Sequence, residues 1–129
     1  MSIPVISLFL AAIFAIASKA PVIKAIKEQF GHYNNKSPRE QMQQLAGWGA
    51  RAQAAHQNML ESFPFFAAGV VVVLATGAVS VFANILCILY ILSRIVYQYL
   101  YLANIDLARS GVWFVGYLCS LVLIILPLF

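Results

Sequence analysis

The sequence predicts an all-α integral membrane protein in which four membrane-spanning helices form a single domain over residues 1–129. The first observation is composition, since 63% of the residues are hydrophobic and only 9% are charged, whereas soluble domains are about a quarter charged. The second is length, because 129 residues hold about four spans of roughly 20 residues each and little else. The third is the position of the charges, which fall at one end of almost every hydrophobic segment.

The first span is predicted over residues 2–26. Residues 1–18 are apolar and uncharged, so a signal peptide is the alternative interpretation, with a small-residue cleavage site near Ala17. A signal peptide, however, has a basic segment before its hydrophobic one, and no Lys or Arg precedes Lys19. We therefore expect a retained span.

The second span is predicted as one long helix over residues 38–75, after a polar loop at 27–45. Ser37 is expected to cap this helix, with Pro38 at its first position and Glu40 completing a capping box. At 1.5 Å per residue the helix is about 57 Å long, nearly twice a bilayer core of about 30 Å. Its polar first half is therefore expected to leave the membrane or to pack against neighbours, and a proline further along, Pro64, is expected to kink it.

The third and fourth spans are predicted over residues 78–104 and 109–128. The connections between the last three spans are short, and the first of them carries no charge. Cys87 and Cys119 stand alone in apolar runs without metal-ligand spacing. We interpret both as small buried hydrophobic residues, with a disulfide between them as the alternative.

The charges also predict the topology of the chain in the membrane. Every Lys, Arg, Asp and Glu lies on the side of the first and third connections or in the helix ends that lead to it. The positive-inside rule then puts both termini outside, and the polar loop 27–45 and the polar ends of the spans in the cytoplasm. No basic run is dense enough to indicate nucleic-acid binding, so the expected surroundings are membrane lipid.

Polar side chains form two stripes, one on the second span and one on the third. Offsets of 0, 7 and 10 residues along each helix keep a stripe within about 80° of one face. The stripes comprise Arg51, Asn58 and Glu61 on the second span, and Arg94, Tyr97, Tyr101 and Asn104 on the third. We expect the two stripes to line one crevice. His56 points away from its stripe and is expected to need a different neighbour, such as another subunit.

Two charges lie at matched depth, since Glu61 and Arg94 are about 21 and 24 Å from the outer end of their helices. This predicts an ion pair between them. Polar groups in a membrane also hold helices together, and tyrosines near a helix end can form an interfacial belt. His56 alone is typical of a satisfied core group. For Asn58, Glu61 and Arg94 together, a ligand site is the favoured interpretation.

The segment 51–66 resembles the second-helix signature of the MAPEG family, the membrane-associated proteins in eicosanoid and glutathione metabolism. That signature is an arginine, then Asn58-x-x-Glu61, then Pro64. The stretch 94–101, an arginine followed by tyrosines, resembles the family's third-helix signature. The resemblance covers the whole chain and implies a homotrimer of four-helix subunits that binds glutathione between neighbouring subunits.

The resemblance also implies roles for individual residues. Asn58 and Glu61 would contact the glutathione backbone, with Glu61 taking its ammonium group, and His56 would touch the peptide. The remaining residues would hold the carboxylates or face the thiol: Arg51, Arg94, Tyr97 and Tyr101. Arg109 or Tyr101 would be the catalytic group that activates the thiol. Glutathione would be a co-substrate that attacks lipophilic electrophiles or hydroperoxides, and no metal is implied.

The chain departs from the family pattern at three positions. Ala54 and Ser62 stand where eicosanoid-processing relatives carry an arginine and often a tyrosine, and Arg109 is one residue out of register. A specialised prostaglandin or leukotriene role is therefore not expected. Two functions stay open, namely a membrane glutathione transferase or peroxidase, and a non-catalytic trimeric scaffold that binds glutathione or another small anion without turnover.

Overall fold

The computed structural model describes residues 2–129 of the chain as helices joined by short turns, with no strand among those residues. The elements are α1 (Ile3–Ala17), α2 (Ala20–Phe30), α3 (Pro38–Gln43), α4 (Trp48–Ala75), α5 (Val81–Leu102), α6 (Asp106–Ile125) and the 3₁₀ turn η1 (Leu126–Leu128). Within this described part of the chain, four stretches are long and apolar enough to cross a membrane, and they are Ile3–Phe30, Trp48–Ala75, Val81–Leu102 and Asp106–Leu128. The predicted membrane bundle of four helices is therefore confirmed.

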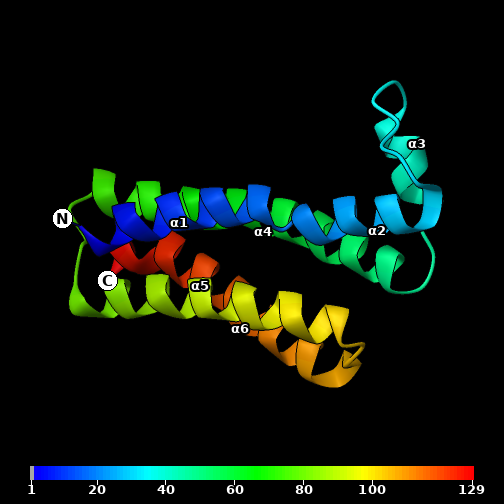
Figure 1. Ribbon diagram of the computed structural model, residues 1–129. Coiled ribbons are helices and arrows are strands. Elements are labelled where there is room, and N and C mark those ends of the chain that lie inside the picture. Colours follow the sequence, from blue (N-terminus) through cyan, green and yellow to red (C-terminus); the bar gives the residue numbers. More distant parts are fainter. Residues whose placement is uncertain (1) are drawn as a thin grey trace.

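The two chain ends lie at the same end of the bundle as the turn between α4 and α5, whereas α2, α3 and the α5–α6 turn lie at the opposite end (Figure 1). Large apolar side chains are exposed around the outside, including Ile16 at 78% and Leu107 at 84%. Apolar surface on this scale is unfavourable in water and suits contact with lipid. The chain is an integral membrane protein, and the side of the membrane on which each end lies stays a prediction.

The first span differs from the prediction because it is two helices that continue to Phe30. Proline has no backbone N–H, so Pro21 cannot continue the hydrogen-bond ladder, and the chain makes a turn at Ser18 and Lys19 before α2 begins. The helix ends only at Gly31, whose φ of 78° is the left-handed conformation that glycine adopts without strain.

The prediction of one helix over residues 38–75 is wrong, because α3 and α4 are separate helices. The chain breaks at Gly47, which has φ 57°. The side chain of Gln29 on α2 holds this break in place. Its amide donates to the carbonyl of Ala46 at 2.9 Å and accepts from the N–H of Ala46 at 3.0 Å. These backbone groups are thereby satisfied outside a helix.

The predicted capping box at Ser37 is also absent, since the Ser37 side chain makes no cap hydrogen bond. The polar turn before α3 is instead held by Asn34 and Gln41. Asn34 Oδ1 accepts from the backbone N–H of Ser37 at 3.2 Å. The Gln41 amide accepts from the N–H of Asn34 at 2.8 Å and donates to the carbonyl of His32 at 2.9 Å. Asn34 therefore satisfies the backbone donor before Pro38.

α4 runs without a break through Pro64 to Ala75, and its end is a Schellman motif. Gly77 has φ 70°, the N–H of Gly77 donates to the carbonyl of Leu74, and the N–H of Ala78 donates to that of Val73. This double hydrogen bond satisfies the last carbonyls of a helix. The uncharged turn predicted here is confirmed.

α5 ends two residues earlier than predicted, at Leu102, for the same reason. Asn104 takes φ 60°, and the N–H of Ile105 donates to the carbonyl of Leu100 at 2.9 Å. Asparagine is the residue other than glycine that most readily adopts this conformation. Asn104 therefore leaves the polar stripe of the third span, and the next helix begins at Asp106 rather than at residue 109.

The centre of the bundle is packed around Tyr90 and Phe66, whose rings stack with centroids 3.8 Å apart. The Tyr90 hydroxyl is bonded to Ser62 Oγ at 2.9 Å. Cys87 and Cys119 are buried beside this cluster and are both free thiols, so their interpretation as small hydrophobic residues is confirmed. The polar side chains of the two stripes come next along α4 and α5, toward the end of the bundle that contains α2 and the α5–α6 turn (Figure 1).

Candidate functional site

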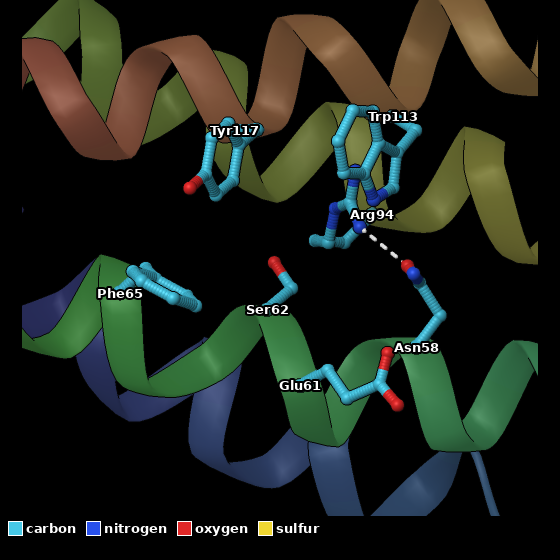
Figure 2. Close-up of a pocket in the computed structure, with 7 residues that line it drawn as sticks. All are labelled: Asn58, Glu61, Ser62, Phe65, Arg94, Trp113 and Tyr117. Atoms are coloured by element: carbon cyan, nitrogen blue, oxygen red, sulfur yellow. Dashed lines mark hydrogen bonds between the residues drawn. The ribbon is translucent and has the colours of Figure 1, made fainter.

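Two adjoining pockets lie between α4, α5 and α6 and form one crevice. The first has a volume of about 160 Å³ and is lined by Asn58, Glu61, Ser62, Phe65, Arg94, Trp113 and Tyr117 (Figure 2). The second has a volume of about 240 Å³ and is lined by Asn58, Tyr97, Tyr101, Arg109, Ser110 and Trp113. Asn58 and Trp113 line both pockets. The crevice therefore places charged groups inside the membrane-spanning bundle.

Arg94 is the central group of the crevice and is 2% exposed. Its Nη1 donates to Asn58 Oδ1 at 3.0 Å, and its guanidinium carbon lies 4.9 Å from the centre of the Tyr97 ring. Its Nη2 is buried and has no hydrogen-bond partner within residues 2–129. A buried charged donor without a partner is costly, and this atom is left unsatisfied by the described residues.

The predicted ion pair between Glu61 and Arg94 is absent. Among the residues that the structure describes, the ion pair that forms joins Lys24 and Glu28 near the surface, at 3.9 Å. Asn58, three residues before Glu61, takes the guanidinium instead, and a neutral amide avoids the cost of burying a second charge. The Glu61 carboxylate lies on the α4 side of the pocket, below the bond that joins Asn58 to Arg94 (Figure 2).

The second pocket brings the two candidate catalytic residues together. The Arg109 guanidinium lies over the Tyr101 ring, 4.1 Å from its centre, so the register shift does not remove Arg109 from the crevice. Tyr101 and Tyr97 meet edge to face with centroids 5.6 Å apart. Tyr99, between them, is 67% exposed. The interfacial-belt interpretation therefore fits Tyr99, whereas Tyr97 and Tyr101 belong to the crevice.

His56 lies on the other face of α4. Its Nδ1 is 2.7 Å from Ser18 Oγ, and that hydroxyl donates to the carbonyl of Ala15 at 2.9 Å. Because a hydroxyl has one hydrogen, the Nδ1–H of His56 is the donor to Ser18. The neighbour of His56 is thus in the same chain rather than in another subunit. His56 lines a separate pocket with residues that include Lys19 and Arg39.

Of the eight predicted site residues, six line the crevice: Asn58, Glu61, Arg94, Tyr97, Tyr101 and Arg109. His56 and Arg51 line neither pocket of the crevice, and the Nε of Arg51 is buried without a hydrogen-bond partner in residues 2–129. On α4, His56 therefore lies on the other face, whereas Arg51 shares the face of Asn58 by helical spacing but lies two turns earlier, outside both pockets.

Sequence reasoning missed the aromatic wall of the crevice. Trp113 and Tyr117 stack with centroids 5.3 Å apart, and Tyr117 meets Phe65 edge to face at 5.5 Å. A signal for this wall was present, because Arg109, Trp113 and Tyr117 are spaced four residues apart, which is one face of a helix. No three His, Cys, Asp or Glu side chains cluster in the described part of the chain.

These features define a small helical membrane protein whose spans enclose a charged crevice beside an apolar core. A model of the MAPEG family matches residues 3–129, which is essentially the whole chain, and the protein belongs to this family. Neither the curated proteins nor the solved structures contained a match to the chain. The sequence-based family prediction is confirmed, and the protein is a membrane protein of the family that acts in eicosanoid and glutathione metabolism.

Proposed function

We propose that the protein is a membrane-bound glutathione transferase or peroxidase that activates the glutathione thiol for attack on lipophilic electrophiles or hydroperoxides. The observation that carries this proposal is a pair of opposite charges that line one pocket without neutralising each other. Arg94 keeps a buried, unpartnered Nη2, and the Glu61 carboxylate lines the same pocket. Charges inside membrane spans are rare and usually mark function.

The γ-glutamyl end of glutathione matches this charge pattern. It carries an ammonium and a carboxylate on one carbon, so the ammonium can donate to Glu61 while the carboxylate accepts from the Arg94 guanidinium. Hydrogen bonds between charged partners are roughly twice as strong as neutral ones. Asn58, which lines both pockets, would position the peptide between the binding end of the crevice and the end that contains Tyr101 and Arg109.

Thiol activation is assigned to Arg109 and Tyr101. The thiolate, rather than the thiol, is the nucleophile, and a hydrogen bond to a charged group contributes about 1.5–3 kcal/mol. In transfer, the thiolate forms a C–S bond to the electrophile as the leaving group departs with its electron pair. In reduction, the thiolate attacks the terminal hydroperoxide oxygen and forms a sulfenic acid as the O–O bond breaks, and the alkoxide leaves and takes a proton to become the alcohol. The thiolate of a second glutathione then attacks the sulfenic sulfur, which forms the disulfide and releases water.

The lipophilic co-substrate would enter from the membrane and pack on the aromatic wall of Phe65, Trp113 and Tyr117. We further propose that the protein works as a homotrimer, as the family resemblance implies, with a neighbouring subunit covering the open side of the crevice. Glu61 and Trp113 are exposed in the single chain, which leaves room for such a contact. The mass of the detergent-solubilised protein, measured by light scattering, tests the trimer.

The decisive experiment combines a thermal-shift titration with glutathione and a turnover assay with an aryl halide, for the wild type and Arg109→Ala. We expect glutathione to stabilise both proteins. We expect turnover in the wild type to exceed that of Arg109→Ala on the order of a hundred-fold or more, the loss typical of one stabilising donor. A wild type that glutathione does not stabilise would contradict the proposal.

The second candidate function is a non-catalytic membrane scaffold. Ala54, where eicosanoid-processing relatives carry an arginine, and the register of Arg109 favour it. Glutathione binding by the wild type without turnover would support this alternative. Glutathione analogues that lack the γ-glutamyl group test whether the crevice binds a different anionic ligand instead. These analogues should bind more weakly than glutathione if Glu61 takes the ammonium.

A further inference from the structure

Gly116 on α6 lies directly against the Arg94 guanidinium. A Cβ atom at this position would be 2.6 Å from Arg94 Nη2, 3.1 Å from Arg94 Cζ and 2.5 Å from Ser93 Oγ. Interiors are packed as closely as crystals of small molecules, and the first and last of these distances leave no room for a methyl group. The absence of a side chain at Gly116 therefore creates the space in which the guanidinium lies.

The guanidinium is also held on its other sides, so it cannot move away freely. Its Nη1 is bonded to Asn58 Oδ1 at 3.0 Å, and its Nε donates to Ser93 Oγ at 3.4 Å. Ser93 Oγ in turn donates to the carbonyl of Tyr90 at 2.7 Å. A methyl group at Gly116 would have to displace either this serine or the end of the arginine, and the long arginine side chain is the more flexible of the two.

We propose that Gly116 is the positioning residue that seats the Arg94 guanidinium in the crevice, where the arginine would hold a ligand carboxylate. The inference rests on the proposed function, because it takes that carboxylate to belong to glutathione. Gly116 touches no substrate and acts through Arg94. A side chain at position 116 should therefore weaken ligand binding only while the arginine is present, and that dependence distinguishes positioning from a general role in packing.

Two other glycines provide matched controls. Gly111 is on the same helix, and a Cβ there would meet nothing within 4 Å, so Gly111→Ala reports the effect of alanine in α6 alone. Gly69 on α4 is as tightly packed as Gly116, with Leu123 Cβ at 2.8 Å and the carbonyl oxygen of Ser120 at 3.0 Å from an added Cβ. Gly69→Ala therefore reports crowding between α4 and α6 away from Arg94.

The test is a thermal-shift titration with glutathione of the full chain in detergent. We expect Gly116→Ala to raise the Kd for glutathione on the order of ten- to a hundred-fold, the size of effect that a misplacement of about 1 Å produces. Gly111→Ala and Gly69→Ala should keep the wild-type Kd within about two-fold, although Gly69→Ala should lower the Tm. An unchanged Kd in Gly116→Ala, beside a wild type that binds, would overturn the inference.

The double variant Arg94→Leu/Gly116→Ala completes the test. Residues in contact show non-additive effects, so the double variant should bind glutathione no more weakly than Arg94→Leu alone. An equal loss from Gly116→Ala in both backgrounds would mean that Gly116 acts through packing, and would overturn the inference.

The Tm values of the same proteins need no ligand and separate this inference from the proposed function. Gly116→Ala should lower the Tm or prevent folding, and removal of the Arg94 guanidinium should relieve part of that loss, because the contact with Ser93 Oγ remains. A higher Tm for Arg94→Leu/Gly116→Ala than for Gly116→Ala supports the inference that Gly116 seats the Arg94 guanidinium. That result would hold even if glutathione did not stabilise the wild type, and the lack of stabilisation would refute only the proposed function. A double variant as unstable as Gly116→Ala would count against the seat.

Discussion

The two faces of α4 carry polar groups at nearly the same depth but use them differently. On one face, His56 Nδ1–H donates to Ser18, and Ser18 donates to Ala15, so the Nδ1 of His56 and the Ser18 hydroxyl both have partners. On the other face, Asn58 holds only one edge of Arg94, and the second edge is buried and unpaired. A satisfied network ties helices together, whereas a network with one unsatisfied charged donor matches the ligand site that we propose.

The charges near the two faces differ in the same way. The pocket beside His56 contains Lys19 and Arg39 but no acidic side chain. The crevice beside Asn58 contains two cations, Arg94 in its first pocket and Arg109 in its second. It also contains the carboxylate of Glu61, in the first pocket. A site with both signs selects a zwitterion, since each end of the ligand meets an opposite charge. This difference favours the Asn58 face as the site for a peptide with free ammonium and carboxylate groups.

The largest expected effect comes from Arg94→Leu, which removes the unpaired donor from the Asn58 face. Loss of one partner of a buried charged pair costs about 2–5 kcal/mol, so the Kd for glutathione should rise on the order of a hundred-fold or more. A thermal-shift titration measures it. Arg94→Lys is the control, because it keeps the charge but not the planar fork. An Arg94→Leu protein with wild-type affinity for glutathione would refute the assignment of ligand binding to the Asn58 face.

A smaller and different effect is expected from Ser18→Ala, which breaks the network on the His56 face. A buried donor left without its partner costs about 1–3 kcal/mol, so the Tm should fall while the Kd for glutathione keeps its wild-type value. Thermal unfolding of the solubilised protein, with and without glutathione, gives both quantities. A large loss of affinity with little loss of stability would instead make the His56 face part of the ligand site.

The smallest effect is expected from Ser62→Ala at the border of the crevice and the core. Ser62 Oγ is bonded to the Tyr90 hydroxyl, and an ordinary neutral hydrogen bond contributes about 0.5–1.5 kcal/mol. The free energy of unfolding should fall by about that amount. Ser80→Ala, which removes the cap of α5 far from the crevice, is a control for a comparable loss of stability. Turnover that falls for Ser62→Ala alone would assign the hydroxyl to the site.

The sequence by itself determined the membrane class, the number of spans, the family and the two polar stripes. These properties depend on composition and on the spacing of residues along one helix, which are local. The periodicity of α4 and α5 was sufficient to put Asn58, Glu61, Arg94, Tyr97 and Tyr101 on faces that meet, and all five line the crevice. The same periodicity on α6, from Arg109 to Tyr117, also predicts the aromatic wall.

Only the tertiary structure decided which partners these side chains take. Periodicity fixes the face of a helix, but a long arginine reaches more than one turn of its neighbour, so Asn58 rather than Glu61 binds Arg94. The break before α4 depends on Gln29, which is distant in sequence from Ala46. The seat at Gly116 exists because α5 and α6 pack closely. Each is a contact between segments, and its distance is set by the packing of whole helices.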